Sequence, residues 1–195
     1  SNNPFDDFGR QHGSHVAGII TADGLDGRAI GVAPGARIIA GKVLDSQGKG
    51  NYSTIATGIY WAINGPDKIY GTSDDFEPDA INISIGGGNY QSICDNTSNE
   101  ARDMTKAIQY ARDRGAVVVV AAGNITPDNP GPYTTMPGCI NEAFTVSNLS
   151  GNTINSSSKT GPAVDIAAPG TNIYSTVAGS GYGAKSGTSM ASPMV

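Results

Sequence analysis

One stretch of the chain alternates a helix with a buried strand, and this restricts the fold more than any other feature. Residues 116–122 are an unbroken apolar run, Ala-Val-Val-Val-Val-Ala-Ala, which is typical of a central strand in a parallel sheet. The preceding residues, 99–114, repeat apolar side chains along one helical face, and Gly115 ends that helix. Helices that alternate with strands in this way predict an α/β domain with a parallel sheet.

The same periodicities predict further elements on both sides of this unit. The 195 residues fit one domain and suffice for a substantial core. With 27 glycines and 11 prolines the domain is expected to be rich in loops. Helices are expected at residues 13–21 and 53–63, and strands at residues 37–44, 79–85, 142–147 and 163–170.

The charge balance excludes two classes of partner. Lys and Arg number 12 against 17 Asp and Glu, a net charge of −5, which attracts neither nucleic acid nor an anionic membrane surface. No stretch approaches the roughly 20 consecutive apolar residues of a transmembrane helix. Cys94 and Cys139 permit either one disulfide, typical of an oxidising compartment, or two free buried thiols, and the sequence leaves both open.

A serine between small residues stands near the end of the chain. Ser189 lies in Gly-Thr-Ser-Met-Ala-Ser-Pro, residues 187–193. A helix that begins there directs its free N–H groups at a charge forming beside the hydroxyl, which fits a nucleophile. Gly/Ser/Thr clusters also mark ordinary loops, so a base elsewhere in the chain has to decide between the two.

A histidine supplies the candidate base. His12 opens the segment His-Gly-Ser-His-Val-Ala-Gly, residues 12–18, and lies at the open end of the helix expected there. Together with Ala-Ala-Gly-Asn at residues 121–124, the segments at 12–18 and 187–193 resemble those of the subtilisin-like serine proteases, in the same order. The resemblance implies a three-layer α/β/α fold with a mostly parallel central sheet.

The resemblance identifies residues 1–195 as a subtilase catalytic domain that is truncated at both ends. The strand that carries the triad aspartate of the family is expected upstream, and the C-terminal helices are expected downstream. Asp6 and Asp7 lie in a loop context and are not assigned to the triad. Because loss of this aspartate lowers kcat of such enzymes by about 10⁴, the chain alone is expected to be nearly inactive.

The resemblance also implies catalytic roles for three residues. Ser189 is expected to attack the carbonyl of a peptide bond, His12 to take its proton, and Asn124 to donate its side-chain amide to the oxyanion. His15 is expected to pack in its helix rather than serve as a second base. The predicted activity is that of a serine-type endopeptidase acting on polypeptides.

Substrate contacts are expected at two strand ends and a turn. In the family, the edge that ends in the triple glycine pairs with the substrate backbone. Residues 134–138 fall where the family forms the floor of the pocket for P1, the residue before the cleaved bond. Met136 stands there in place of an aromatic, and we expect a medium-sized or large apolar P1 residue. The expected substrate-binding residues are Ser84, Ile85, Gly86, Gly87, Ala121, Ala122, Gly123 and Thr135.

Two acidic segments raise the question of calcium. The turn at residues 23–27 offers Asp23 and Asp26, which are too few for a cation with about 6–8 oxygen ligands. The insertion at residues 65–77 carries several carboxylates without a calcium-loop spacing, which favours a solvated loop. We assign no metal ligand and expect no cofactor in the chemistry, with calcium left open as a structural ion.

The resemblance further implies a secreted monomer with a pro-segment upstream of this chain. One alternative is a degenerate subtilase that acts as a binding module, which requires the triad aspartate to be substituted. Another is a lipase or esterase, in which the serine lies in Gly-x-Ser-x-Gly and the histidine follows it. Ala191 and the early His12 break both rules, so we expect a serine endopeptidase.

Overall fold

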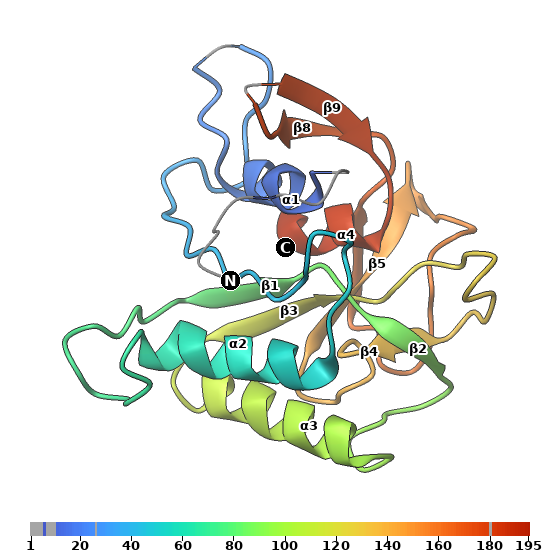
Figure 1. Ribbon diagram of the computed structural model, residues 1–195. Coiled ribbons are helices and arrows are strands. Elements are labelled where there is room, and N and C mark those ends of the chain that lie inside the picture. Colours follow the sequence, from blue (N-terminus) through green and yellow to red (C-terminus); the bar gives the residue numbers. More distant parts are fainter. Residues whose placement is uncertain (1–5, 7–10, 26, 180) are drawn as a thin grey trace.

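The computed structural model describes residue 6 and residues 11–25, 27–179 and 181–195. Two residues named above, Asp7 and Asp26, lie outside the described residues. A central sheet carries helices on both of its faces (Figure 1), so the predicted three-layer α/β/α architecture is confirmed.

The central sheet is built around the apolar run, which forms strand β3. β3 pairs in parallel with one strand on each side, and a fourth strand continues the parallel order. The sheet comprises β1 (Ala80–Ile83), β3 (Val117–Ala121) and β5 (Phe144–Ser150), followed by β7 (Ile166–Pro169) and the short antiparallel β6 (Thr153–Ile154), both paired with β5. The carboxyl ends of parallel strands meet at one edge, where ligands of such sheets bind.

Two helical layers cover this sheet. α2 (Tyr52–Asn64) and α3 (Asn99–Arg112) pack together on one face (Figure 1). On the other face lie α1 (His12–Thr21), α4 (Thr188–Ala191) and a 3-10 turn at Ser192–Met194. The helices predicted from the sequence are present with slightly shifted bounds. None of the described helices combines the length and the apolar composition needed to cross a bilayer.

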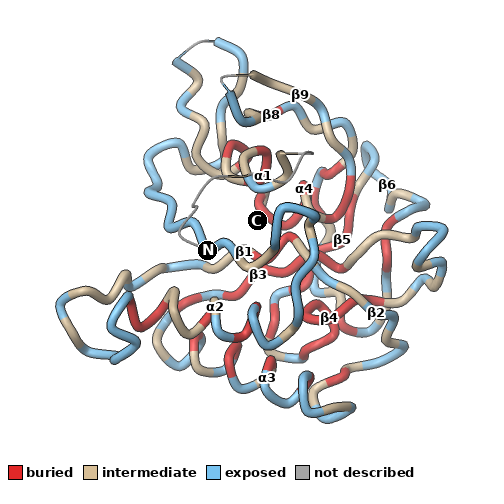
Figure 2. Tube along the Cα trace, in the orientation of Figure 1, coloured by how far each residue is buried: buried red, intermediate tan, exposed pale blue. Residues whose placement is uncertain are grey.

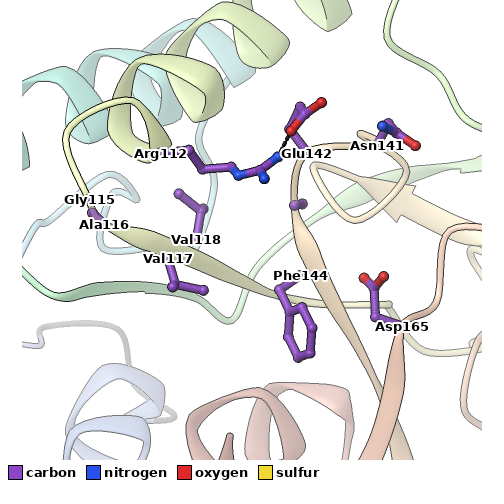
Figure 3. Close-up of a pocket in the computed structure, with 10 residues that line it drawn as sticks. Arg112, Gly115, Ala116, Val117, Val118, Asn141, Glu142, Phe144 and Asp165 are labelled. Carbon is purple, nitrogen blue, oxygen red and sulfur yellow. Dashed lines mark ion pairs between the residues drawn. The ribbon is translucent and has the colours of Figure 1, made fainter.

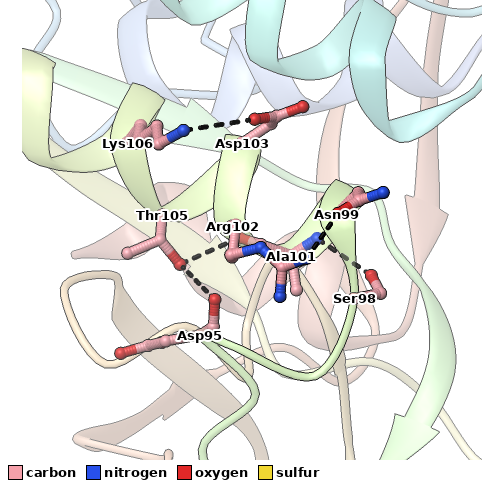
Figure 4. Close-up of polar contacts among 8 residues, drawn as sticks. All are labelled: Asp95, Ser98, Asn99, Ala101, Arg102, Asp103, Thr105 and Lys106. Atoms are coloured by element: carbon pink, nitrogen blue, oxygen red, sulfur yellow. Dashed lines mark hydrogen bonds and ion pairs between the residues drawn. The ribbon is translucent and has the colours of Figure 1, made fainter.

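Side chains at the N-termini of α2 and α3 determine where these helices begin. Asn51 Oδ1 accepts a hydrogen bond from the backbone N–H of Thr54 (2.8 Å), and Ser98 Oγ accepts one from that of Ala101 (3.1 Å). Figure 4 shows the second cap together with Thr105, whose hydroxyl bonds back to the carbonyl of Ala101. A cap of this kind contributes about 1 kcal/mol to stability.

The main core lies between β3 and the helix pair. Ile59, Met104, Ile108, Val118 and Val120 are at most 2% exposed. Figure 2 shows this buried layer in red along β3 and along the inner sides of α2 and α3. Burial of one such side chain contributes about 1.5–3 kcal/mol, so this layer holds the helices on the sheet.

Two antiparallel pairs flank the central sheet. β2 (Gly87–Tyr90) pairs with β4 (Thr134–Met136) beyond the carboxyl end of β1. β8 (Ile173–Val177) pairs with β9 (Gly181–Lys185) and lies against α1 (Figure 1). These pairs extend the walls around the edge at which β1 and β3 end.

The strand predicted at residues 37–44 is wrong. That segment forms neither a strand nor a helix, and Ile38 and Ile39 are 43% and 38% exposed. A strand needs a neighbour that pairs its N–H and C=O groups. Within the described residues the sheet ends at β1, so this apolar segment has no neighbouring strand with which it pairs.

Cys94 and Cys139 form a disulfide, which decides between the two states that the sequence left open. Their Cα atoms are 5.4 Å apart, and the backbone N–H of Cys94 donates to the carbonyl of Cys139 (2.9 Å). The bond joins the segment before α3 to the turn after β4, 45 residues away along the chain.

Removal of this disulfide is expected to destabilise the fold. A Cys94→Ala/Cys139→Ala variant should lose about 4 kcal/mol of unfolding free energy, because the crosslink restricts a long loop of the unfolded chain. Urea unfolding followed by circular dichroism measures the difference. Dithiothreitol should weaken the parent and leave the variant unchanged, and a loss below about 1 kcal/mol contradicts the prediction.

Candidate active site

The predicted catalytic segments meet at the carboxyl edge of the sheet. Ser84 directly follows β1, and Asn124 lies just beyond the end of β3. Ser189 is the second residue of α4, which packs against the sheet at this edge (Figure 1). Hydrogen bonds join α4 to both strand ends.

Ser84 holds the nucleophile segment from one side. The Ser189 hydroxyl donates to the Ser84 carbonyl (3.0 Å), and the Ser84 hydroxyl donates to the Ser189 carbonyl (2.9 Å). Ser84 Oγ also accepts from Asn82 Nδ2 (2.9 Å) and lies 2.8 Å from Ser192 Oγ. Because the single proton of Ser84 is already used, Ser192 is the donor in that contact. Together these bonds fasten α4 to the end of β1.

Asn124 is oriented from the opposite side by Thr188. Asn124 Oδ1 accepts from the backbone N–H of Thr188 (3.0 Å) and lies 3.4 Å from the Thr188 hydroxyl. Thr188 Oγ1 in turn accepts from the backbone N–H of Gly123 (3.1 Å). Because Oδ1 faces these donors, the N–H groups of Nδ2 are left for a ligand. This orientation fits the donor role predicted for Asn124.

The backbone before Ser189 requires glycine. Gly187 has φ 147°, which is disfavoured for a residue with a Cβ, and a Cβ there would lie 3.3 Å from the Asn124 side chain. Glycine therefore allows α4 to begin at Thr188 beside the amide. Sequence reasoning gave no role to Thr188 or Ser192, although both lie inside the Gly-Thr-Ser-Met-Ala-Ser-Pro motif.

His12 is the first residue of α1 and is half-buried. Burial lowers its pKa below the ordinary value of 6.5, and the Lys185 ammonium lowers this pKa further. Asp6 acts in the opposite direction, and His15 adds a smaller lowering. The Asp6 carboxylate also caps α1, where it accepts from the backbone N–H of Ser14 (2.8 Å). The imidazole is neutral near pH 7, which is the state that a general base requires.

The helices that carry the two predicted catalytic residues pack against each other. Val16 and Ile19 of α1 form a buried cluster with Met190 of α4. This cluster holds the helix that begins at His12 against the helix that carries Ser189. The Ser189 hydroxyl donates to the Ser84 carbonyl rather than to His12.

His15 is a packed helix residue, as predicted. It is fully buried, and its Nε2 lies 3.1 Å from the carbonyl of Ile173 and 3.0 Å from that of Gly183. Both contacts need a donor, so Nε2 carries a proton. Burial lowers the pKa of His15, while the two carbonyls act against this shift. The ring therefore anchors α1 to the β8–β9 pair.

The predicted substrate-binding residues form two walls beside Ser189. One wall is the segment 84–86, between β1 and β2, and the other is the segment 122–124, after β3. Thr135 of β4 lies between them, next to Gly86 and Gly123.

Three of the predicted substrate-binding residues are part of the core or of a strand ladder. Ala121 and Ala122 are 3% and 0% exposed, so their side chains belong to the core. Gly87 pairs with Met136 in the β2–β4 ladder. These residues support the two walls through their backbones.

A cavity of about 380 Å³ lies at the opposite edge of the sheet (Figure 3). It is lined by Val117 and Phe144 at the amino ends of β3 and β5, with Asp165 beside them. Arg112 and Glu142 form an ion pair at its rim. The amino ends of parallel strands lie away from Ser189, so this cavity is not part of the candidate site.

Three carboxylates of the acidic insertion come together. Oxygens of Asp67, Asp74 and Asp75 lie within 4.8 Å of one another. The backbone N–H of Asp67 donates to Asp74 (3.0 Å), and that of Gly71 donates to Asp75 (2.7 Å). These carboxylates hold the loop itself.

Comparison with protein families agrees with this geometry. The profile of the subtilase family (Peptidase_S8) matches residues 1–195, which is the whole chain. The chain belongs to the subtilase family.

Individual subtilases match the chain along nearly all of its length. Subtilisin E of Bacillus subtilis (strain 168) is 39% identical over 202 residues, covering 99% of this chain and 45% of that protein. Subtilisin-like protease 1 of Arthroderma otae is 38% identical over 192 residues, covering 98% of this chain and 35% of that protein. The crystal structure of a cold adapted subtilisin-like serine proteinase matches with a TM-score of 0.72 and 31% identity, over 94% of this chain and 57% of that one. This subtilase chain therefore spans 35% to 62% of the length of such curated relatives.

The pKa of His12 is expected to lie below 6.5 in this subtilase, because burial and the Lys185 ammonium both favour the neutral ring. A lowered pKa means that the neutral base persists to lower pH. A Lys185→Met variant is expected to raise the pKa of His12, since it removes a repelling cation. The chain has two histidines, so an NMR titration can follow both rings.

Lys106→Met serves as the control, since this lysine is 69% exposed on α3. It is expected to leave the pKa of His12 unchanged. A Lys185→Met variant with the parental pKa contradicts the assigned cause.

Proposed function

We propose that this subtilase is a serine-type endopeptidase, which hydrolyses peptide bonds. The observation that carries the proposal is the placement of Ser189 between the Ser84 carbonyl and the segment that orients Asn124. A nucleophile with an oriented amide beside it is what acyl transfer requires. The relatives named subtilisins and subtilisin-like proteases support the same reaction class.

In the proposed mechanism, Ser189 Oγ attacks the carbonyl carbon of the substrate while His12 takes the hydroxyl proton. Negative charge develops on the carbonyl oxygen, which accepts from Asn124 Nδ2 and from the backbone N–H of Ser189. Collapse of this intermediate breaks the C–N bond, and His12 gives its proton to the leaving amine. Water then attacks the acyl-enzyme, with His12 again as base, and releases the acid and free Ser189.

Thr188 prepares the amide of Asn124 before the substrate arrives. Its backbone N–H and hydroxyl occupy the side-chain oxygen, so the donor end of the amide needs no rearrangement during the reaction. Preorganised donors of this kind stabilise a developing oxyanion by several kcal/mol.

The aspartate that orients the base is proposed to lie on a segment outside this chain. Asp6 is not assigned to this role, because it lies in a loop context and not at the strand end that carries this aspartate in the family. Without this partner His12 is not held in the required tautomer, and kcat falls by about 10⁴. The full-length protein is therefore the form to assay.

The proposed substrates are polypeptides, and the proposed setting is extracellular. The Cys94–Cys139 disulfide supports an oxidising compartment. A net charge of −5 offers no attraction to nucleic acid or to an anionic membrane surface. The proposal includes a monomer, a pro-segment that precedes this chain, and chemistry in which the side chains need no cofactor.

A fluorophosphonate probe tests the proposal on the full-length protein. We expect covalent labelling of Ser189, and loss of both labelling and peptide hydrolysis in Ser189→Ala and His12→Ala, because each removes a partner in the same proton transfer. Ser156→Ala, at an exposed serine, is the control and should be labelled normally. A folded parent that is not labelled overturns the endopeptidase and favours a degenerate subtilase that binds without cleaving.

Replacement of the oxyanion donor is expected to slow catalysis without weakening binding. Asn124→Leu should lower kcat by about 10²–10³, the loss measured for an oxyanion-hole donor of subtilisin, because the bond is made in the transition state. Steady-state kinetics should show KM nearly unchanged. Asn152→Leu, at an exposed turn, is the control, and a change confined to KM contradicts the assigned role.

A further inference from the structure

Lys159 is a buried cation to which the proposed mechanism gives no role. The residue is fully buried. Its ammonium donates to Asn89 Oδ1 (2.9 Å), Asn129 Oδ1 (3.0 Å) and the carbonyl of Gly131. These neutral acceptors use all three of its N–H groups. Burial lowers the pKa of Lys159, so the protein keeps this charge inside although desolvation disfavours it.

The ammonium ties together two segments that lie far from it in the sequence. Asn129 and Gly131 belong to the loop that directly follows Asn124, and Asn89 belongs to β2. This loop contains no helix or strand, so contacts with other segments have to fix its course. One side chain from the segment after β6 therefore determines where the chain runs once it has passed Asn124.

The backbone at Lys159 supports the residues on both sides of Asn124. The backbone N–H of Lys159 donates to the carbonyl of Gly123 (3.0 Å). The backbone N–H of Ile125 donates to the carbonyl of Ser157 (2.7 Å). These two bonds pair Asn124, as a single antiparallel bridge, with the residue before Lys159. The Lys159 side chain then extends from this bridge to the loop, so one residue holds Asn124 and the loop after it.

The bridge is itself fixed to the central sheet. Ser147 Oγ donates to the carbonyl of Lys159 (2.8 Å), and the backbone N–H of Asn148 donates to Ser158 Oγ (2.9 Å). Ser147 and Asn148 belong to β5, and both are fully buried. Lys159 thus connects a well-packed strand to the segment that carries the oxyanion donor.

We propose that Lys159 is a positioning residue for the oxyanion donor, which keeps the main chain of Asn124 where the reaction requires it. This inference rests on the proposed endopeptidase function. Thr188 binds the side-chain oxygen of Asn124, whereas Lys159 holds the main chain that carries this side chain. The bond to the oxyanion is made in the transition state, so a displaced Asn124 lowers kcat and leaves substrate binding nearly unchanged.

Lys159→Met tests this on the full-length protein, because methionine keeps an unbranched apolar side chain and has no N–H donor. We expect kcat to fall by about 10-fold to 100-fold, since a small displacement of a catalytic group slows the reaction steeply. KM should stay within about 2-fold of the parental value. Lys106→Met, at a lysine that is 69% exposed on α3, is the control and should keep the parental kcat.

A double-mutant cycle separates a positioning role from a general loss of structure. If Lys159 acts through Asn124, Lys159→Met should lower kcat by less than about 2-fold in an Asn124→Leu background, where the amide is already absent. A general structural role instead lowers kcat by the same factor in both backgrounds. That result overturns the inference, as does a change confined to KM.

Thermal melts show which variants fold. If Lys159→Met does not fold, Asn89→Ala decides, because it removes one acceptor at an exposed position and keeps Lys159. Its smaller loss of kcat should also disappear in the Asn124→Leu background. A folded parent in which Ser189 is not labelled by the fluorophosphonate removes the proposed function and this inference together. A labelled Ser189 with parental kcat in the folded variants removes this inference alone.

Discussion

The parallel pairing of β1, β3 and β5 is the constraint on which the site depends. It brings the ends of β1 and β3 to one edge, so that Ser84 and Asn124 come close although they are far apart in the chain. α4 then joins the two ends, because Ser189 bonds to Ser84 and Thr188 bonds to Asn124. A register shift of one residue between β1 and β3 would turn alternate side chains to the other face of the sheet and separate these partners. The strand register thus determines whether Ser189 and Asn124 lie close enough for the proposed reaction.

Neutral groups make the polar contacts around Ser189. Hydroxyls, amides and backbone groups link Ser84, Thr188 and Asn124 to α4, and each such bond contributes about 0.5–1.5 kcal/mol. Charge enters mainly at His12, where burial and Lys185 keep the ring neutral. In the proposed reaction, transfer of the Ser189 proton creates an imidazolium at His12, which burial and the Lys185 ammonium both disfavour. The oxyanion forms in the same step, and the proposed mechanism assigns it to the amide of Asn124, whose side-chain oxygen is already bound by Thr188.

Local patterns in the sequence predicted the elements that depend on local causes. The apolar run at 116–122 became β3, and the amphipathic segment at 99–114 became α3 with Ser98 as its cap. The catalytic segments were also visible, because glycine, histidine and serine stand in long specific motifs. The strand expected at 37–44 was wrong because pairing depends on a neighbouring strand, which no periodicity reports. The state of Cys94 and Cys139 stayed open for the same reason, since only the fold brings their Cα atoms to 5.4 Å.

Gly86 and Gly123 show that the role of a glycine depends on which remote segment packs against it. In the sequence, the triple glycine at residues 86–88 indicates room for a substrate backbone, because glycine has no side chain. In the structure, Thr135 packs so closely against Gly86 and Gly123 that neither position has room for a Cβ. Lys159 packs against Gly123 in the same way. Its ammonium donates to three neutral acceptors, on Asn89, Asn129 and Gly131. These contacts join segments that are remote in sequence, so no local motif could predict the close packing at the two glycines, and only the fold shows it.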